Sequence, residues 1–185
     1  TRPSKETYLQ YHENANRLLM DISNHFNVHI SQITFDLIIE FFETKFNILF
    51  VYFEADLMYK WLSNKKQEVK YNLTSKNSLS LVDFSFCNVC SGMTIPDFER
   101  NRFIVYINQD VVKSRVMFTI LHELTHIYFH LMSSVYDKVL VSKTSSNYSD
   151  YYPTEIAPLE DEANTIASIL FLNDYKLLAY ITSGL

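Results

Sequence analysis

The chain has 185 residues, of which 48% are hydrophobic, so it is long enough to bury one sizeable core and too apolar to be disordered. Its net charge of −5 and the lack of a Lys- and Arg-rich stretch argue against nucleic acid as a direct partner. Because it has only two cysteines, no basic-then-apolar leader and no apolar run that could cross a bilayer, we expect a soluble cytoplasmic protein without membrane contact.

The amino-terminal part predicts helices and one strand. Apolar residues recur at helical spacing over residues 4–26, and a second helix through Phe46 could be capped by Ser31 or Thr34. A continuous β-prone run at residues 47–53 predicts a buried strand, and a short helix is expected at residues 55–62. Residues 63–78 are polar and predict an exposed loop.

Two further strands are expected before the central helix. Residues 79–89 alternate as in a half-buried strand, Ser91-Gly92 predicts a turn, and residues 102–108 predict the returning strand. Asp110 is the expected N-cap of the helix that follows. A free edge on the strand at residues 102–108 would allow it to hold an extended substrate peptide by backbone hydrogen bonds.

The expected central helix contains the string H-E-x-x-H, from His122 to His126. Residues four apart on a helix lie about 40° apart in azimuth and about 6 Å apart along the axis, so both imidazoles can reach one ion. Glu123, on an adjacent face, could act on a water held by that ion. The pattern is typical of zinc peptidases, in which the Glu is the general base.

The residues around this motif support a metal site. They are apolar nearly all round the helix, which predicts that it is buried. Two buried imidazoles and a carboxylate would be costly without partners, and a bound metal removes that difficulty.

A catalytic zinc needs a third protein ligand and keeps one position for water. His130 lies eight residues after His122, so the three histidine rings on one straight helix would be spread over about 12 Å. Phe129 stands where the metzincin pattern needs a glycine to turn the chain. The third ligand is therefore expected on a later element.

A suitable helix is expected through Leu172, with Pro158 in its first turn, after a long loop at residues 133–153. Glu160 is the predicted third ligand, because small residues on the same stripe would let this helix approach the motif helix closely. Glu162 is the alternative third ligand. Asn164, one turn after Glu160, could orient a ligand imidazole.

Three stretches of the chain resemble the ImmA/IrrE family of metallopeptidases: residues 104–108 (IVYIN), 115–130 (RVMFTILHELTHIYFH) and 160–167 (EDEANTIA). The resemblance covers roughly residues 79–173. It implies an α+β, zincin-like fold with a small, mostly antiparallel sheet packed on helices, and Glu160 as the family's third ligand. It also implies a cytoplasmic protease that cleaves a helix-turn-helix repressor. The chain departs from the family pattern at Thr125, where a glycine is frequent.

We therefore predict a single domain over residues 1–185. Residues 1–62 would supply the amino-terminal helices and the first strand, and residues 79–185 the sheet, the H-E-x-x-H helix and the third-ligand helix. The predicted function is zinc-dependent hydrolysis of a peptide bond in a separate repressor, which would derepress prophage, mobile-element or stress genes. The residues that would carry it are the metal ligands His122, His126 and Glu160 and the catalytic Glu123.

Two other functions stay open. One is a metal-bound regulator that binds a repressor without cleaving it, and the other is a structural zinc in a protein-interaction module, which would need four protein ligands and no Glu123. For the peptidase, Tyr148, Tyr151 and Tyr152 in the expected loop are candidates to stabilise the tetrahedral oxyanion.

Overall fold

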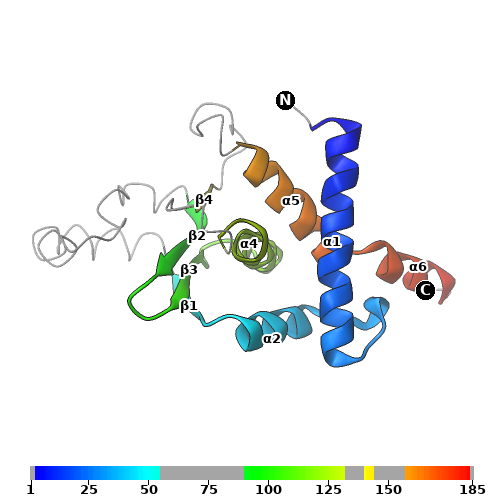
Figure 1. Ribbon diagram of the computed structural model, residues 1–185, viewed down its shortest axis with the longest axis horizontal. Coiled ribbons are helices and arrows are strands. Elements are labelled where there is room, and N and C mark those ends of the chain that lie inside the picture. The colour runs from blue at the N-terminus through cyan, green and yellow to red at the C-terminus, as the bar shows by residue number, and fades with distance from the viewer. Residues whose placement is uncertain (1–2, 55–89, 132–139, 144–156, 184–185) are drawn as a thin grey trace, which may run out of the picture.

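The structure, a computed structural model, describes residues 3–54, 90–131, 140–143 and 157–183. Within these ranges the fold is α+β, as the sequence predicts, with helices packed on a four-stranded sheet (Figure 1). The expected helix at residues 55–62, loop at 63–78 and strand at 79–89 lie outside the described residues.

The first two helices begin and end close to their expected positions because polar caps mark them. Helix α1 (Lys5–Phe26) begins after Ser4, whose hydroxyl accepts a hydrogen bond from the Thr7 backbone N–H, and it ends at Asn27 in the left-handed conformation. After the short 3₁₀ segment η1 (Ile30–Gln32), Thr34 caps α2 (Phe35–Lys45) in the same way.

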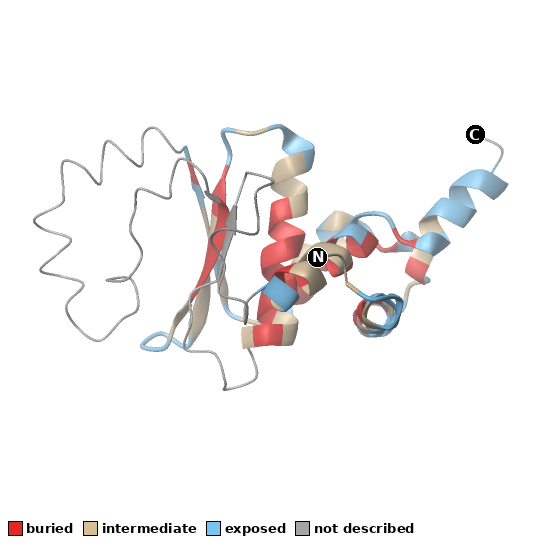
Figure 2. Cartoon of the chain, turned by 90° about the horizontal axis from the view of Figure 1, so that it is seen from above, coloured by how far each residue is buried: buried red, intermediate tan, exposed pale blue. Residues whose placement is uncertain are grey.

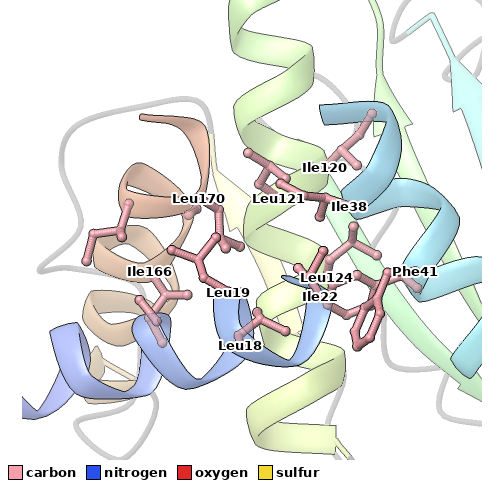
Figure 3. Close-up of a cluster of buried hydrophobic side chains, with 14 of the residues drawn as sticks. Leu18, Leu19, Ile22, Ile38, Phe41, Ile120, Leu121, Leu124, Ile166 and Leu170 are labelled. Carbon is pink, nitrogen blue, oxygen red and sulfur yellow. The ribbon is translucent and has the colours of Figure 1, made fainter. Parts of the chain in front are cut away.

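The H-E-x-x-H helix α4 (Lys113–Thr125) lies between the sheet on one side and α1 and α5 (Ala157–Phe171) on the other (Figure 1). It is therefore buried along most of its length, as its apolar surroundings predict (Figure 2). Fully or nearly fully buried side chains from four helices meet beside it (Figure 3): Leu18, Leu19 and Ile22 of α1, Ile38 and Phe41 of α2, Ile120, Leu121 and Leu124 of α4, and Ile166 and Leu170 of α5.

The sheet has the strand order β1-β3-β2-β4, where β1 is Ile48–Phe53, β2 is Cys90–Asp97, β3 is Arg102–Asn108 and β4 is Leu140–Lys143. Strand β1 runs parallel to β3, whereas the β3–β2 and β2–β4 pairs are antiparallel. Thr94 pairs with Val105 and Gly92 with Ile107, so these residues share one face of the sheet. Val105 and Ile107 belong to the helical core, which places this face toward α4.

Several expectations about the strands were wrong. Strand β3 is paired on both sides, so it offers no free edge to a peptide. Strand β1 is not fully buried, because it is an edge strand of the described sheet and exposes 51% of Tyr52. The chain does not turn at Ser91-Gly92 but continues as β2, and β4 lies inside the region expected to be a loop.

Helix α4 does not begin at Asp110. The Asn108 side chain accepts a hydrogen bond from the Asp110 backbone N–H at 2.9 Å, which makes a local turn, and the helix starts after Val112 without a side-chain cap. Helix α5 has Pro158 in its first turn, as expected. Asn173 caps the exposed last helix, α6 (Asp174–Thr182). Among the described helices, none combines the length and the apolar character needed to cross a bilayer.

Candidate metal centre

Helix α4 carries the H-E-x-x-H motif in its last turn, where the helix changes its winding. From His126 to Leu131 the chain continues as a π-helical segment, η4, a feature that is often found at functional sites. The Thr125 hydroxyl donates a hydrogen bond to the Leu121 carbonyl at 2.8 Å, so this fully buried polar side chain is satisfied. Thr125 therefore adds no unpaired polar group to the core.

His122, His126 and Glu160 converge at one point between α4 and α5. The two histidine Nε2 atoms are 3.0 Å apart. Glu160 places Oε2 at 3.2 Å from Nε2 of His122 and Oε1 at 3.2 Å from Nε2 of His126. Ligand atoms from the three residues lie within 4.8 Å of one another, and each residue is at most 2% exposed. The structure thus brings together the three residues that the sequence suggested as ligands.

The chemistry of this cluster fits a divalent cation. Both carboxylate oxygens of Glu160 are buried, and no described residue gives either of them a well-formed hydrogen bond. A buried carboxylate that lacks donors is costly unless a positive charge compensates it. Two imidazole nitrogens and a carboxylate are a donor set that zinc accepts, although manganese, cobalt or iron can use it as well.

The pKa shifts of the cluster also fit a site for a cation. Burial raises the pKa of Glu160, but the nearby imidazoles outweigh it and bring that pKa down to about 2. Burial lowers the pKa of His126 to about 4, and the interaction with Glu160, which favours the charged ring, does not offset it. Burial also opposes charge on His122, but Glu160 and Glu123 prevail and raise its pKa. His122 therefore binds a proton more tightly than an ordinary imidazole does, and a cation bound at this ring must displace that proton.

Glu123 is held against strand β2. It is 0% exposed, and its Oε2 accepts a hydrogen bond from the Thr94 hydroxyl at 2.5 Å. Gly92 lies on the same face, where a Cβ atom would come within 2.6 Å of Thr119 Cγ2 and 3.0 Å of Glu123 Oε1. Only a glycine lets the strand approach the helix this closely. The carboxylate expected to act as a base thus has a fixed position.

Glu162, the alternative third ligand, does not join the cluster. Its Oε2 lies 3.1 Å from Nε2 of His130, and its Oε1 accepts a hydrogen bond from Asn14 Nδ2 at 2.8 Å. Two positions after Glu160 on a helix is about 200° round the axis, so the two carboxylates point to different neighbours. His130 in turn contacts the back of His126, with 2.7 Å between their Nδ1 atoms.

Asn164 lies where it can support a ligand. Its side chain lies one turn of α5 after Glu160 and interacts with His122. The tyrosines considered for the oxyanion, Tyr148, Tyr151 and Tyr152, lie outside the described residues.

Sequence reasoning missed Thr94, Gly92 and Asn14 as parts of this site. Thr94 and Asn14 reach it from 29 and 148 residues away along the chain, so no local spacing could reveal them. Gly92 did leave a signal, because the chain has only two glycines and an isolated glycine in a strand pattern often marks a close backbone approach.

No protein-family model, curated protein or solved structure matches this chain. What the protein does must therefore be inferred from the residues of the site.

Proposed function

We propose that this protein is a metal-dependent endopeptidase with a zincin-like fold. His122, His126 and Glu160 would be its metal ligands and Glu123 its general base. One observation carries the proposal: three buried ligand side chains converge on one point, and a second buried carboxylate, that of Glu123, directly follows His122 on α4 and is held by Thr94.

The residues of the chain suit peptide hydrolysis. A divalent cation such as zinc supplies a Lewis acid that polarises a carbonyl and acidifies water when it is bound. Glu123 would remove a proton from the attacking water and deliver it to the leaving amine. The hydrogen bond from Thr94 restricts rotation of the Glu123 carboxylate, which keeps the base in one orientation during both transfers.

A structural zinc site explains these features less well. Such a site has four protein ligands, whereas three ligand side chains converge in the described part of the chain. A structural ion would also have no use for Glu123, a buried carboxylate whose negative charge must be tolerated beside the ligands. The buried Glu123 carboxylate beside the three ligands therefore favours catalysis.

The resemblance to the ImmA/IrrE family supports a choice of substrate. On that basis the substrate is a separate helix-turn-helix repressor, and its cleavage would derepress prophage, mobile-element or stress genes in the cytoplasm. The chain's net charge of −5 fits recognition of the repressor protein itself rather than of its DNA.

The first prediction tests this function with a Glu123→Gln variant. We would load wild type and variant with zinc, measure the bound metal, and incubate each with a helix-turn-helix repressor encoded beside its gene. Fragments would be identified by mass spectrometry. We expect both proteins to bind one zinc ion and the variant to cleave at least about 100-fold more slowly, because only the general base is lost.

A Glu13→Gln variant is the matched control, since Glu13 is an exposed residue of α1. Its cleavage rate should equal that of the wild type. Cleavage by the Glu123→Gln protein at the wild-type rate would contradict the mechanism. If neither protein cuts and both still relieve repression in a reporter strain, the non-cleaving regulator is the correct function.

A further inference from the structure

A chain of four polar side chains runs outward from the back of His126. Nδ1 of His126 lies 2.7 Å from Nδ1 of His130, and Nε2 of His130 lies 3.1 Å from Oε2 of Glu162. Oε1 of Glu162 accepts a hydrogen bond from Asn14 Nδ2 at 2.8 Å. These residues come from η4, α5 and α1, so the four side chains connect three elements on the side of His126 that faces away from Glu160.

This chain, which we call the His126 relay, has two buried histidines at one end and the partly exposed Glu162 and Asn14 at the other. His126 and His130 are 1% and 3% exposed, and the Glu162 side chain is 16% exposed. Glu162 contacts Asn14 Nδ2 through Oε1 and His130 Nε2 through Oε2. As a carboxylate it can only accept hydrogen bonds from these two neighbours.

Glu162 can only accept hydrogen bonds, and this determines which atom donates in each bond of the relay. Because Glu162 accepts from Nε2–H of His130, the neutral His130 ring has a lone pair on Nδ1. His126 must then donate its Nδ1–H to that lone pair. Its Nε2, which faces His122 and Glu160, is left with a lone pair.

We propose that Glu162, acting through His130, is a positioning residue that selects the His126 tautomer able to bind the metal. The inference rests on the metal centre of the proposed function, whose ligand His126 the relay would prepare. In the opposite tautomer, Nε2 of His126 carries the proton and its lone pair points at His130, so the ring cannot coordinate at the cluster.

Asn14 is held so that it presents a donor to Glu162. Its Oδ1 accepts hydrogen bonds from the Arg17 guanidinium and from Gln10 Nε2, the latter at 3.3 Å. The amide nitrogen of Asn14 therefore faces Glu162. Helix α1 lies outside the stretch that resembles the peptidase family, yet it supplies this last member of the relay.

This arrangement makes Glu162→Gln a sharp test. With the Asn14 NH₂ facing it, the new amide turns its oxygen to Asn14 and its own NH₂ to His130. His130 then accepts at Nε2 and donates from Nδ1, which forces the proton of His126 onto Nε2. We expect the zinc affinity, measured by competition with a chromophoric chelator, to fall about 10- to 100-fold.

The double variant Asn14→Asp/Glu162→Gln should restore binding. The new carboxylate on α1 would accept a hydrogen bond from the NH₂ of the new amide on α5, and it could still accept from Arg17 and Gln10. The oxygen of that amide would then face His130 and recover the original bond direction. We expect zinc affinity within about threefold of the wild type, whereas a residue that merely packs would not be rescued by a second substitution.

The tautomers can also be read without metal or catalysis. Long-range ¹H–¹⁵N spectra of the metal-free protein should show His126 protonated at Nδ1 and His130 at Nε2 in the wild type and the double variant. Both assignments should reverse in Glu162→Gln. Far-UV circular dichroism and urea unfolding would confirm that each variant is folded, and Glu13→Gln serves as the exposed control.

Three results would overturn the relay: a wild-type His126 protonated at Nε2, wild-type zinc affinity in Glu162→Gln, or a double variant no better than the single one. None of these depends on proteolysis. A wild type that binds no metal would instead refute the proposed function, and the tautomer spectra would still decide whether the relay orients His126.

Discussion

At the scale of single residues, Glu123 has the most constrained environment in the site. It is fully buried, it accepts a hydrogen bond from Thr94, and its Oε1 lies close to the position where any side chain on Gly92 would be. These contacts come from a neighbouring strand, so the strand positions the base as much as the helix does. The motif spacing predicted which residues meet on α4, but it could not predict contacts made across 29 residues of chain.

The second prediction concerns Gly92. An alanine there would place Cβ 2.6 Å from Thr119 Cγ2, and a β-branched side chain on a helix has little freedom to move away. We expect Gly92→Ala to lower the free energy of unfolding by about 1–3 kcal/mol and to slow cleavage, because β2 must shift away from Glu123. Urea unfolding and the repressor-cleavage rate measure the two effects.

Thr119→Ala provides the matched test, because it removes the Cγ2 atom that the new methyl group would meet. The double variant Gly92→Ala/Thr119→Ala should therefore lose less stability than the sum of the two single variants. If the losses simply add, the clash with Thr119 is not the cause.

At the scale of elements, the helices were easier to predict than the strands, because the signals of a helix are local in sequence and those of a strand are not. Helix α1 shows its apolar face as a regular stripe and ends at polar caps, and both signals are local in sequence. The burial of β1 depends instead on whether a strand pairs on its outer side, which sequence does not show. The Ser91-Gly92 pair has turn composition, but packing against α4 keeps it extended.

The third prediction tests this packing in α1. Leu18 is 0% exposed in the core beside α4, whereas Met20 on the same helix is 48% exposed. Leu18→Ala should lower the free energy of unfolding by about 2–5 kcal/mol, because it leaves a cavity among the helices. Met20→Ala should change it by less than about 0.5 kcal/mol. Equal effects in urea unfolding would contradict the assignment of this buried face.

At the scale of the whole molecule, the candidate metal centre lies where α4 and α5, which already pack together in the hydrophobic core, meet. His122 comes from the end of α4, His126 from the start of η4 and Glu160 from α5, and the proposed relay behind His126 extends the connection to α1. The ligand types and their helices could be predicted from sequence. The strand order β1-β3-β2-β4 and the role of α1 could not, because both depend on contacts between distant segments.

The fourth prediction links metal binding to pH. The pKa of His122 is raised above its usual 6.5, that of His126 is lowered to about 4, and that of Glu160 is lowered to about 2. Between about pH 5 and the raised pKa of His122, the metal must therefore displace one proton, and that proton comes from His122. The zinc affinity should fall about tenfold for each pH unit as the pH decreases through this window.

The stabilisation by zinc should also fall as the pH decreases, because it grows with zinc affinity. A ligand that binds only the folded state raises the free energy of unfolding by about 2.7 kcal/mol at 100 times its dissociation constant. The difference in unfolding free energy between zinc-loaded and chelator-treated protein should thus be largest at high pH and decrease by about 1.4 kcal/mol per unit toward pH 5 at fixed free zinc. Urea unfolding at a series of pH values, with free zinc set by a buffer, measures it. If the stabilisation by zinc changes with pH as though two protons were released, the second proton comes from His126 or Glu160. If the stabilisation does not change with pH, zinc binds elsewhere.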